Sequence, residues 1–540
     1  MAQIQEVLSH LLSNLHDHVT PTHILIAIPS VLLTYYILSA IYTRYYHLRE
    51  FDGPFFASFS YAWLARVVLS GQMGDRLTET NRRYSKHNTT TTTVRVGPND
   101  LLTMDPDVIR RCSAARSRYV RSNWYAMGRL DPWDDNLFSH MDTGLHDKLK
   151  AKMAAGYAGK ENPGLEDDIE EVIGFMISRI RERYAVGGGG TGEKKVEKPL
   201  LDFGHMAQYM TLDVITKVAF GSEFGFLEQE KDLHGYIAMI EQIAPPSVLC
   251  SGVPYLSDFF AQPWVIRLLS PKAGDSRGFG KMMGVAKEIV DARYGGNKEE
   301  KQDMMASFMR HGLTRRQVET EAIFQIVAGS DTTATAIRAT VLHVVTCPRV
   351  YNALQREIDE AISQNKISTP AKAAEGAALP YLQAVISEGL RIHPPFNGIP
   401  SKVVPPEGDY IDGKFVPGGT RILPCFGGLG RNKTVFGEDA DVFRPERFLE
   451  AQREDPERAA EMRRVAEMAF GYGRFACAGK PVAMLELNKV FVEVSFAYCS
   501  LCVLVKEREV VVVPLNLAVL SQQRLLTIWT HTTIAVVPAL

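Results

Sequence analysis

Apolar residues recur at helical spacing in several stretches of the chain, and one short stretch alternates residue by residue. The first strong feature is a run without charge at residues 24–42. About 19 residues in a helix rise roughly 28 Å, which matches the hydrocarbon core of one bilayer. Glu6 and Asp17 precede this run, whereas Arg44 and Arg49 follow it. The positive-inside rule therefore predicts a lumenal N-terminus and a cytosolic remainder.

A cleaved signal peptide is the alternative interpretation of this run. Such peptides carry a basic segment before the apolar stretch and small residues after it. Here no Lys or Arg precedes residues 24–42, and Tyr and Arg follow them. We therefore expect a retained anchor. The chain then divides into a lumenal segment (1–23), a transmembrane helix (24–42), a linker (43–54) and one large domain (55–540).

A second long helix is predicted in the C-terminal half. Thr314 and Gln317 have the spacing of a capping box, and Pro348 disfavours helix beyond Cys347. The helix between them would span about 33 residues, or roughly 50 Å. Its centre, residues 328–333, reads Ala-Gly-Ser-Asp-Thr-Thr and consists mostly of poor helix formers. A sequence that weakens a core helix at its centre usually does so for function.

Two other regions interrupt the helical pattern. Residues 91–96 alternate like a strand and run into a turn at 97–100, which predicts a small N-terminal sheet. Residues 243–260 are apolar and contain Pro245 and Pro246, so we expect a loop there. The whole pattern predicts a mainly α fold with small β-sheets.

Composition narrows the classes of function. The 540 residues carry a formal net charge of −2 and are 46% hydrophobic. This is enough apolar material for a large core, and it lacks the basic excess of a nucleic-acid-binding protein. Seven cysteines are dispersed without a framework spacing, which indicates reduced thiols facing the cytosol.

One of these cysteines has an unusual setting. Cys477 follows the turn-forming Gly471 and Gly473 and precedes a helix with apolar residues at i, i+3 and i+4. Free amides and the dipole at a helix N-terminus favour a thiolate. A single thiolate suits one bond to a soft metal, because a zinc cage needs several cysteines at short spacing. A buried structural cysteine in a glycine-rich loop is the alternative.

The stretch around Cys477 resembles the haem-ligand signature F-G-x-G-x-R-x-C-x-G of the cytochrome P-450 family. The resemblance implies that Cys477 is the axial thiolate ligand of the iron of haem b, where it favours O–O cleavage. Phe475 stands where the family has the Arg that pairs a haem propionate, and an Arg is displaced by one position. The residues that match the signature around the ligand, with that displaced Arg, are Phe470, Gly471, Gly473, Arg474 and Gly479.

The helix centre at 328–333 resembles the A-G-x-D-T-T oxygen-binding groove of the same family. The resemblance implies a local opening of the helix that leaves room for dioxygen. Thr332 and Asp331 would supply protons there, a task that suits a hydroxyl beside a carboxylate. Ordinary back-bonding of Ser and Thr hydroxyls in a bent helix is the alternative.

Two further elements match the family. Glu388 and Arg391 are spaced i, i+3 as in its E-x-x-R motif, and Arg447 lies in Pro-Glu-Arg-Phe. The resemblance implies a buried triad that holds the loop carrying Cys477, in which loss of one partner would leave a buried charge. An exposed i, i+3 salt bridge is the commonplace alternative for the first pair.

The contacts that the family makes to the haem propionates are altered at three positions. Besides Phe475, His146 and Lys150 stand in place of W-x-x-x-R, and residues 430–431 (Gly-Arg) stand in place of His-Arg. Both His146 and Lys150 can donate to carboxylates, although Lys is a point charge rather than a fork. An exposed basic helix face is the alternative for this pair. Arg421 is a further candidate donor.

The resemblance also places candidate walls of a substrate pocket. They lie one turn before the groove and after the Pro-Pro that ends the Glu388 helix, and they imply a mostly apolar small-molecule substrate. These residues are Phe324, Gln325, Val327, Ala328, Phe396, Asn397 and Ile399.

Taken together, the motifs predict a cytochrome P-450 fold with haem between the long central helix and the Cys477 loop. The resemblance implies a single-pass monooxygenase of the endoplasmic reticulum membrane, similar to fungal members of secondary metabolism. It would insert one atom of O2 into its substrate. Electrons would come from NADPH through NADPH-cytochrome P-450 reductase, with cytochrome b5 as a further partner, because the chain has no Rossmann or flavin fingerprint.

The C-terminal stretch is less regular. Residues 503–540 do not match the family's C-terminal hairpin, and we interpret them as an altered or mis-spliced end. One alternative function is therefore a haem-binding but inactive product with an incomplete pocket. Another is a relative that rearranges peroxides or dehydrates substrates without a reductase, although such relatives tend to lack the acid–Thr pair.

Overall fold

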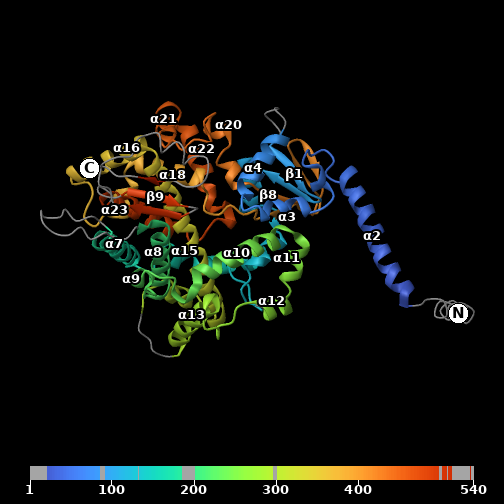
Figure 1. Ribbon diagram of the computed structural model, residues 1–540, viewed down its shortest axis with the longest axis horizontal. Coiled ribbons are helices and arrows are strands. Elements are labelled where there is room, and N and C mark those ends of the chain that lie inside the picture. Colours follow the sequence, from blue (N-terminus) through green and yellow to red (C-terminus); the bar gives the residue numbers. More distant parts are fainter. Residues whose placement is uncertain are drawn as a thin grey trace, which may run out of the picture.

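The computed structural model is mainly helical with small sheets, as the sequence predicts (Figure 1). It describes residues 21–85, 92–131, 133–184, 201–295, 301–497, 502–506, 509–513 and 535–536. Most of the predicted lumenal segment, residues 1–20, lies outside this description. The longer helices are α2 (Pro21–Tyr45), α3 (Ala62–Leu69), α4 (Met73–Tyr84), α5 (Pro106–Ser113), α6 (Thr143–Tyr157), α7 (Leu165–Arg183), α8 (Phe203–Phe220), α10 (Tyr236–Gly252), α13 (Gly278–Tyr294), α15 (Arg315–Thr346), α16 (Pro348–Ser363), α18 (Pro380–Ile392), α21 (Glu446–Glu454), α22 (Pro456–Ala466) and α23 (Lys480–Ala497).

Short helices connect these elements. They are η1 (Phe55–Ser58), η2 (Asn123–Gly128), α9 (Phe226–Gln229), η3 (Leu233–Gly235), α11 (Pro254–Phe260), α12 (Pro263–Leu269), α14 (Met304–Arg310), α17 (Ala373–Ala377), α19 (Phe426–Leu429), α20 (Lys433–Phe436), η4 (Glu467–Phe470) and η5 (Gly473–Phe475).

Helix α15 runs through the centre of the largest core cluster and organises the molecule. Thr314 caps it: the Thr314 side chain accepts from the Gln317 amide, and the Gln317 side chain accepts from the Thr314 amide. The predicted capping box and the predicted helix are therefore confirmed. The helix continues without a break through residues 328–333. Helix α8 approaches it closely at Gly329, where a Cβ would lie 2.8 Å from the Ile215 side chain.

The described residues also form three small sheets. The largest has the strand order β1-β2-β8-β5-β3, the second β11-β9-β10-β4, and the third pairs β6 with β7. The predicted N-terminal strand is confirmed as β1. The strands are β1 (Thr93–Gly97), β2 (Asp100–Thr103), β3 (Val120–Arg121), β4 (Leu201–Asp202), β5 (Lys402–Val403), β6 (Asp409–Ile411), β7 (Lys414–Val416), β8 (Arg421–Pro424), β9 (Cys502–Lys506), β10 (Glu509–Val513) and β11 (Ala535–Val536).

The C-terminal stretch differs from our expectation. Strands β9 and β10 form an antiparallel hairpin, and β10 pairs with β4 ahead of α8. A hairpin is therefore present after α23, in a stretch whose sequence could not be matched to the family's C-terminal hairpin. Residues 514–534 and 537–540 lie outside the described parts of the chain.

The loop predicted at residues 243–260 is also wrong. These residues lie in α10, which contains Pro245 and Pro246, and in α11. A proline in a helix removes the hydrogen bond to the carbonyl four residues earlier. Here those carbonyls belong to Glu241 and Gln242, which are exposed, so water can satisfy them.

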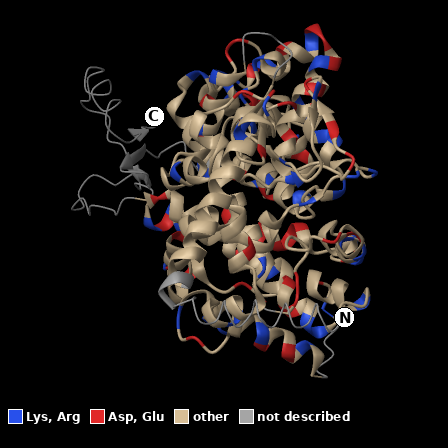
Figure 2. Cartoon of the chain, turned by 90° about the vertical axis from the view of Figure 1, so that its right-hand side faces the viewer, with Lys and Arg blue, Asp and Glu red and all other residues tan. Residues whose placement is uncertain are grey.

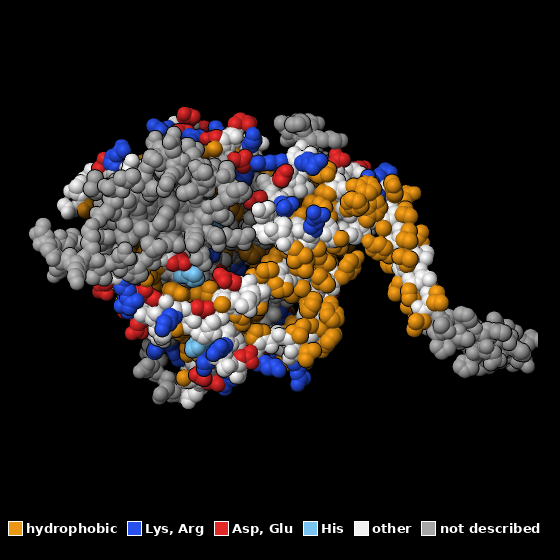
Figure 3. All heavy atoms as spheres, viewed as in Figure 1, with side chains coloured by type: hydrophobic (Ala, Val, Ile, Leu, Met, Phe, Trp, Pro, Cys, Tyr) orange, Lys and Arg blue, Asp and Glu red, His pale blue; other side chains and the backbone are white. Residues whose placement is uncertain are grey.

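Helix α2 projects from the rest of the molecule, and its side chains are mostly exposed and apolar (Figures 1 and 3). Residues Leu25–Tyr45 are long and apolar enough to cross a membrane, which fits a single-pass anchor. Figure 3 shows further apolar side chains on the neighbouring surface. The exposed apolar residues of η1, α3, α11 and α12 are Phe55, Phe56, Leu69, Tyr255, Phe259, Trp264, Leu268 and Leu269. Acidic and basic residues are interspersed along much of the chain (Figure 2).

Candidate active site

The Cys477 loop is shaped by two glycines. Gly471 and Gly473 have φ values of 74° and 60°, a region that side chains with a Cβ rarely adopt. A Cβ on Gly473 would also lie 2.2 Å from the Ser113 carbonyl oxygen. The Cys477 amide donates to the Phe470 carbonyl at 2.7 Å, which closes the loop just before α23 begins. Glycine is therefore required at both turns.

The thiol of Cys477 lies inside the fold and yet remains accessible. Its side chain is exposed, but burial by the surrounding protein raises the pKa of the thiol. The amides of Gly479 and Lys480 and the charge of Lys150 act in the opposite direction and favour the thiolate. A metal ion would displace the proton, since a coordinating thiol is deprotonated outright. Among the described residues, Cys477 supplies one sulfur ligand, and no cluster of three or more potential metal-binding side chains occurs.

Lys150 and Arg474, two of the residues predicted to contact the haem propionates, hydrogen-bond to carbonyl groups of the protein. Lys150 on α6 donates to the Arg474 and Ala476 carbonyls at 2.8 and 2.5 Å and so holds the Cys477 loop. Arg474 donates to the Ala115 carbonyl and lies 3.6 Å from the Asp147 carboxylate.

His146 is buried beside them. Its ring lies 5.2 Å from that of Phe475, and its Nδ1 lies 2.9 Å from the Asp147 carboxylate. Burial, followed by the charge of Arg121, lowers the pKa of His146 to about 4. The imidazole is therefore neutral at pH 7 and can offer an N–H but no charge.

Two other buried cations lie beside Phe475, the residue that stands where the family has its propionate-pairing Arg. Arg121 on β3 and Lys402 on β5 are register partners in the five-stranded sheet, and they are 7% and 5% exposed. Their charged groups lie 4.7 and 3.9 Å from the centre of the Phe475 ring, two residues before Cys477. Like charges directly opposite each other on neighbouring strands are destabilising.

Neither cation is neutralised by a carboxylate in the described residues. The Arg121 guanidinium donates through Nη1 to the Leu137, Phe138 and His140 carbonyls, and its buried Nε has no partner among these residues. Lys402 donates to the Tyr125 hydroxyl at 2.6 Å. Burial, followed by the charge of Arg121, lowers the pKa of Lys402 well below its usual value. Paired buried cations without an anion fit a ligand that brings carboxylates, as haem does.

The sequence carried a weak signal for this pair. Lys402 lies in the apolar stretch Ile399–Val404, and Arg121 follows Val120 in a short strand. A long basic side chain inside an apolar strand is a candidate buried charge, but only the strand pairing shows that the two meet. Arg421, the other candidate, forms a buried ion pair with Asp100 instead.

The groove residues of α15 lie next to one another on the helix. The Thr332 hydroxyl donates to the Ala328 carbonyl at 2.8 Å, which is the back-bonded geometry of the alternative interpretation. The Asp331 carboxylate accepts from the side-chain amide of Gln208 on α8. Burial raises the pKa of Asp331, while the Gln208 hydrogen bond and Arg338 lower it. A raised pKa makes the protonated form of this carboxyl group easier to populate than that of an ordinary Asp.

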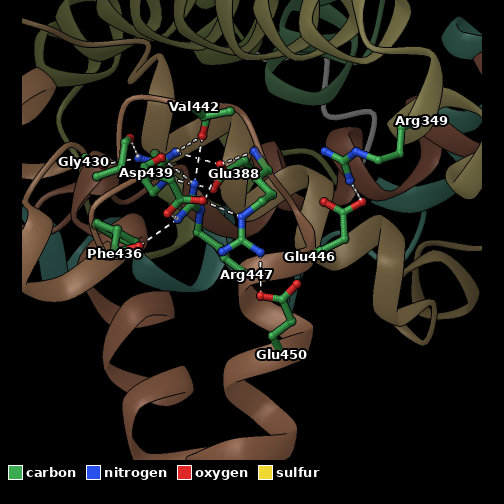
Figure 4. Close-up of polar contacts among 12 residues, drawn as sticks. Arg349, Glu388, Gly430, Phe436, Asp439, Val442, Glu446, Arg447 and Glu450 are labelled. Carbon is green, nitrogen blue, oxygen red and sulfur yellow. Dashed lines mark hydrogen bonds and ion pairs between the residues drawn. The ribbon is translucent and has the colours of Figure 1, made fainter.

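The Glu388, Arg391 and Arg447 side chains meet in a fully buried network (Figure 4). Glu388 accepts from Arg391 at 2.7 Å and from Arg447 at 3.2 Å. Every remaining donor of the two guanidinium groups also has a partner. These partners are the Gly430, Phe436, Asp439, Ala440 and Val442 carbonyls and the Asp439 carboxylate.

The predicted pocket residues separate into two groups. Phe324 stacks on Phe138 at 5.5 Å, Phe138 contacts Trp124 at 5.8 Å, and Trp124 contacts Phe396 at 5.9 Å. This row of rings links α15 to the segment after α18 through η2. Val327 and Ala328 follow Phe324 on α15.

The other three predicted pocket residues contact other parts of the fold. Gln325 contacts the Met304 sulfur, Asn397 accepts from the Gly427 amide, and Ile399 is buried in the core beside the large sheet.

Comparison with known proteins identifies the family of the chain. A family model described as Cytochrome P450 matches residues 59–495. The chain is 45% identical over 463 residues to "Cytochrome P450 monooxygenase ABA1" of Pyricularia oryzae, covering 85% of this chain and 88% of that protein. It is 41% identical over 452 residues to "Cytochrome P450 monooxygenase aba1" of Botryotinia fuckeliana, covering 84% and 86%. The match to "Cytochrome P450 monooxygenase abl1" of Leptosphaeria maculans is 39% identical over 462 residues, covering 85% and 79%. The resemblance drawn from the sequence motifs is thus confirmed, and the chain belongs to the cytochrome P450 family as a P450 monooxygenase.

Proposed function

We propose that this chain is a membrane-anchored haem-thiolate monooxygenase that oxygenates an apolar small molecule in fungal secondary metabolism. The observation that carries the proposal is the buried cation pair Arg121 and Lys402 beside Phe475, next to the accessible Cys477 thiol. Together they would supply one sulfur ligand to the iron of haem b and two cationic partners to its carboxylates. The similarity to fungal monooxygenases supports the same assignment.

The bound haem would supply the redox chemistry that activates dioxygen, and the chain's own residues would set its surroundings. Cys477 would provide the sulfur ligand, held by the Lys150 and Phe470 contacts within the loop. Arg121 and Lys402 would hold the carboxylates, with His146 as a neutral donor. The glycines at 471 and 473 let the loop backbone turn without a Cβ in the way.

Proton supply would fall to α15. Asp331, with its pKa raised by burial, would take a proton from solvent and pass it to the Thr332 hydroxyl. The hydroxyl is bonded to the Ala328 carbonyl and would rotate away from it to donate. This is general acid catalysis by a carboxylate and a hydroxyl in series.

The aromatic row from Phe324 to Phe396 would form one wall of the substrate site and exclude water from it. The reaction would be RH + O2 + NADPH + H⁺ → ROH + NADP⁺ + H2O. Electrons would arrive from NADPH through a separate cytochrome P-450 reductase, with cytochrome b5 as an additional donor. Helix α2 would hold the catalytic domain, residues 55–540, on the cytosolic face of the endoplasmic reticulum.

The test is incorporation of labelled oxygen. Microsomes that contain the protein and a P-450 reductase are incubated with NADPH, ¹⁸O2 and a panel of apolar small molecules. We expect a product that carries one ¹⁸O atom and forms only with NADPH, and no such product from the Cys477→Ala variant. Products that form without NADPH or dioxygen would contradict the proposal and indicate a rearranging or dehydrating enzyme.

A further inference from the structure

A side chain outside the predicted motifs holds the groove acid. Gln208 is 4% exposed and lies on α8, the helix that packs closely against α15 at Gly329. Its side-chain amide donates to the Asp331 carboxylate. Within the described part of the chain this is the one hydrogen bond that the carboxylate receives, and no ion pair joins it there.

The charged and titratable groups around Asp331 come from α15 and α10. Arg338 lies two turns further along α15 and donates to the Thr335 hydroxyl at 2.8 Å rather than to Asp331. Glu241 on α10 adds negative charge, and the buried Tyr236 hydroxyl on α10 has no hydrogen-bond partner among the described residues. Asp331 therefore has Arg338, Glu241 and Tyr236 in its surroundings, and its direct hydrogen-bond partner is the neutral amide of Gln208.

A neutral partner has a different effect from a cation. A cation in contact would form a buried ion pair, which holds a carboxylate ionised and fixed. A hydrogen bond from a neutral amide also orients the carboxylate, but it is weaker than a bond from a cation. The carboxylate can therefore still take up a proton and rotate. Gln208 thus holds the Asp331 carboxylate in one orientation, and little free energy is needed to break this hydrogen bond.

We propose that Gln208 is the positioning residue that sets how fast Asp331 passes protons to Thr332. The inference rests on the proposed role of Asp331 as the proton carrier. Gln208 itself does not contact the reacting atoms, and its effect is transmitted through the Asp331 carboxylate.

The test needs no identified substrate. In the substrate-free, reductase-supported oxidase reaction, O2 and NADPH are consumed to form hydrogen peroxide or water, and both routes take up protons. The rate of NADPH oxidation is measured against pH and in D2O for the wild-type protein and the Gln208→Lys, Gln208→Leu and Asp331→Asn variants. Thr216→Val, which removes another buried polar group from α8, is the matched control. The reduced carbon monoxide spectrum checks that each variant retains haem.

We expect Gln208→Lys to slow NADPH oxidation about tenfold and to enlarge the solvent isotope effect, because an ion pair pins Asp331. Gln208→Leu should move the alkaline fall in rate to higher pH, because loss of the donor raises the pKa of Asp331 and the protonated form persists further. Both effects should vanish when Asp331→Asn is already present. Thr216→Val should behave as the wild type.

Two results would overturn the inference, and they are distinguishable. If Asp331→Asn slows the reaction while both Gln208 variants match the wild type in rate, pH profile and isotope effect, Gln208 has no positioning role and the role of Asp331 stands. If Asp331→Asn itself matches the wild type, the proposed proton route fails and the role of Gln208 fails with it.

Discussion

Two buried clusters of charge lie in this protein, and they differ in how completely they are neutralised. The Glu388 network, formed by Glu388, Arg391 and Arg447, pairs its carboxylate with both guanidinium groups and gives every remaining donor a partner. The Phe475 cations, Arg121 and Lys402, face each other across two strands and have no carboxylate partner in the described residues. Both clusters are more than nine-tenths buried.

This difference in neutralisation distinguishes a cluster that stabilises the fold from a cluster that is suited to binding a ligand. A satisfied network contributes to the fold by itself and needs nothing from outside. A pair of buried like charges costs stability until an anion arrives, and proteins accept such a cost at functional sites. The Glu388 network therefore supports the segment around residues 430–447, whereas the proposed role of the Phe475 cations is to hold a ligand that brings carboxylates.

The largest effect is expected from Glu388→Ala. It leaves Arg391 and Arg447 buried without their shared carboxylate, and breaking a buried pair costs about 3–5 kcal/mol. Chemical denaturation of the haem-free protein measures this loss. Glu450→Ala, which removes a partly exposed partner of Arg444, should cost less than about 1 kcal/mol. Equal losses in the two variants would contradict the account of the network.

The second effect concerns Lys402→Met. Removing one of two opposed buried cations should leave the haem-free protein as stable as the wild type or more stable. It should also speed the transfer of haem to excess apomyoglobin about tenfold, or about 1.4 kcal/mol. Lys433→Met, on the surface, should change neither value. A variant that destabilises the haem-free protein and holds haem normally would show that Lys402 serves the fold.

A third buried charge gives a pH dependence of stability. Glu321 on α15 accepts from the Leu137 amide at 2.6 Å, and its second oxygen has no partner among the described residues. Burial raises the pKa of Glu321 to about 8. The folded state then keeps a proton that the unfolded state loses above its ordinary pKa near 4.5, so stability falls as pH rises from about 4.5 to 8.

Glu321→Gln should remove this dependence. The amide cannot ionise, so its gain in stability over the wild type should be about 3 kcal/mol larger at pH 8 than at pH 5, because each pKa unit is worth about 1.4 kcal/mol. The amide N–H group that lacks a partner lowers this gain equally at both pH values. Thermal unfolding at the two pH values measures the difference. A gain of equal size at both values would contradict the assignment of the shift to Glu321.

Local sequence signals predicted the parts of the site that lie within one segment. The capping box at Thr314, the glycine turns before Cys477 and the i, i+3 spacing of Glu388 and Arg391 all depend on neighbours in the chain. The loop prediction for residues 243–260 was wrong because it relied on the low helix propensity of proline. The sequence does not show that this part of the helix is exposed, where water can satisfy the freed carbonyl groups.

The missed residues depend on contacts between distant segments. Arg121 meets Lys402 only through the pairing of β3 with β5, and Gln208 meets Asp331 only through the packing of α8 on α15. These contacts between distant segments cannot be predicted from the periodicity or the motifs of any one segment. The predicted donors Lys150 and Arg474 were turned to the carbonyls of the loop and its neighbours by the same tertiary packing.

The most direct test of the central claim is the absorption spectrum of the purified protein after reduction and binding of carbon monoxide. The account predicts a Soret band at the thiolate-ligated position for the wild type and for Lys402→Met reconstituted with excess haem, and loss of that band in Cys477→Ala. A folded wild-type protein that shows a histidine-like or neutral-thiol band, or that binds no haem, would contradict it.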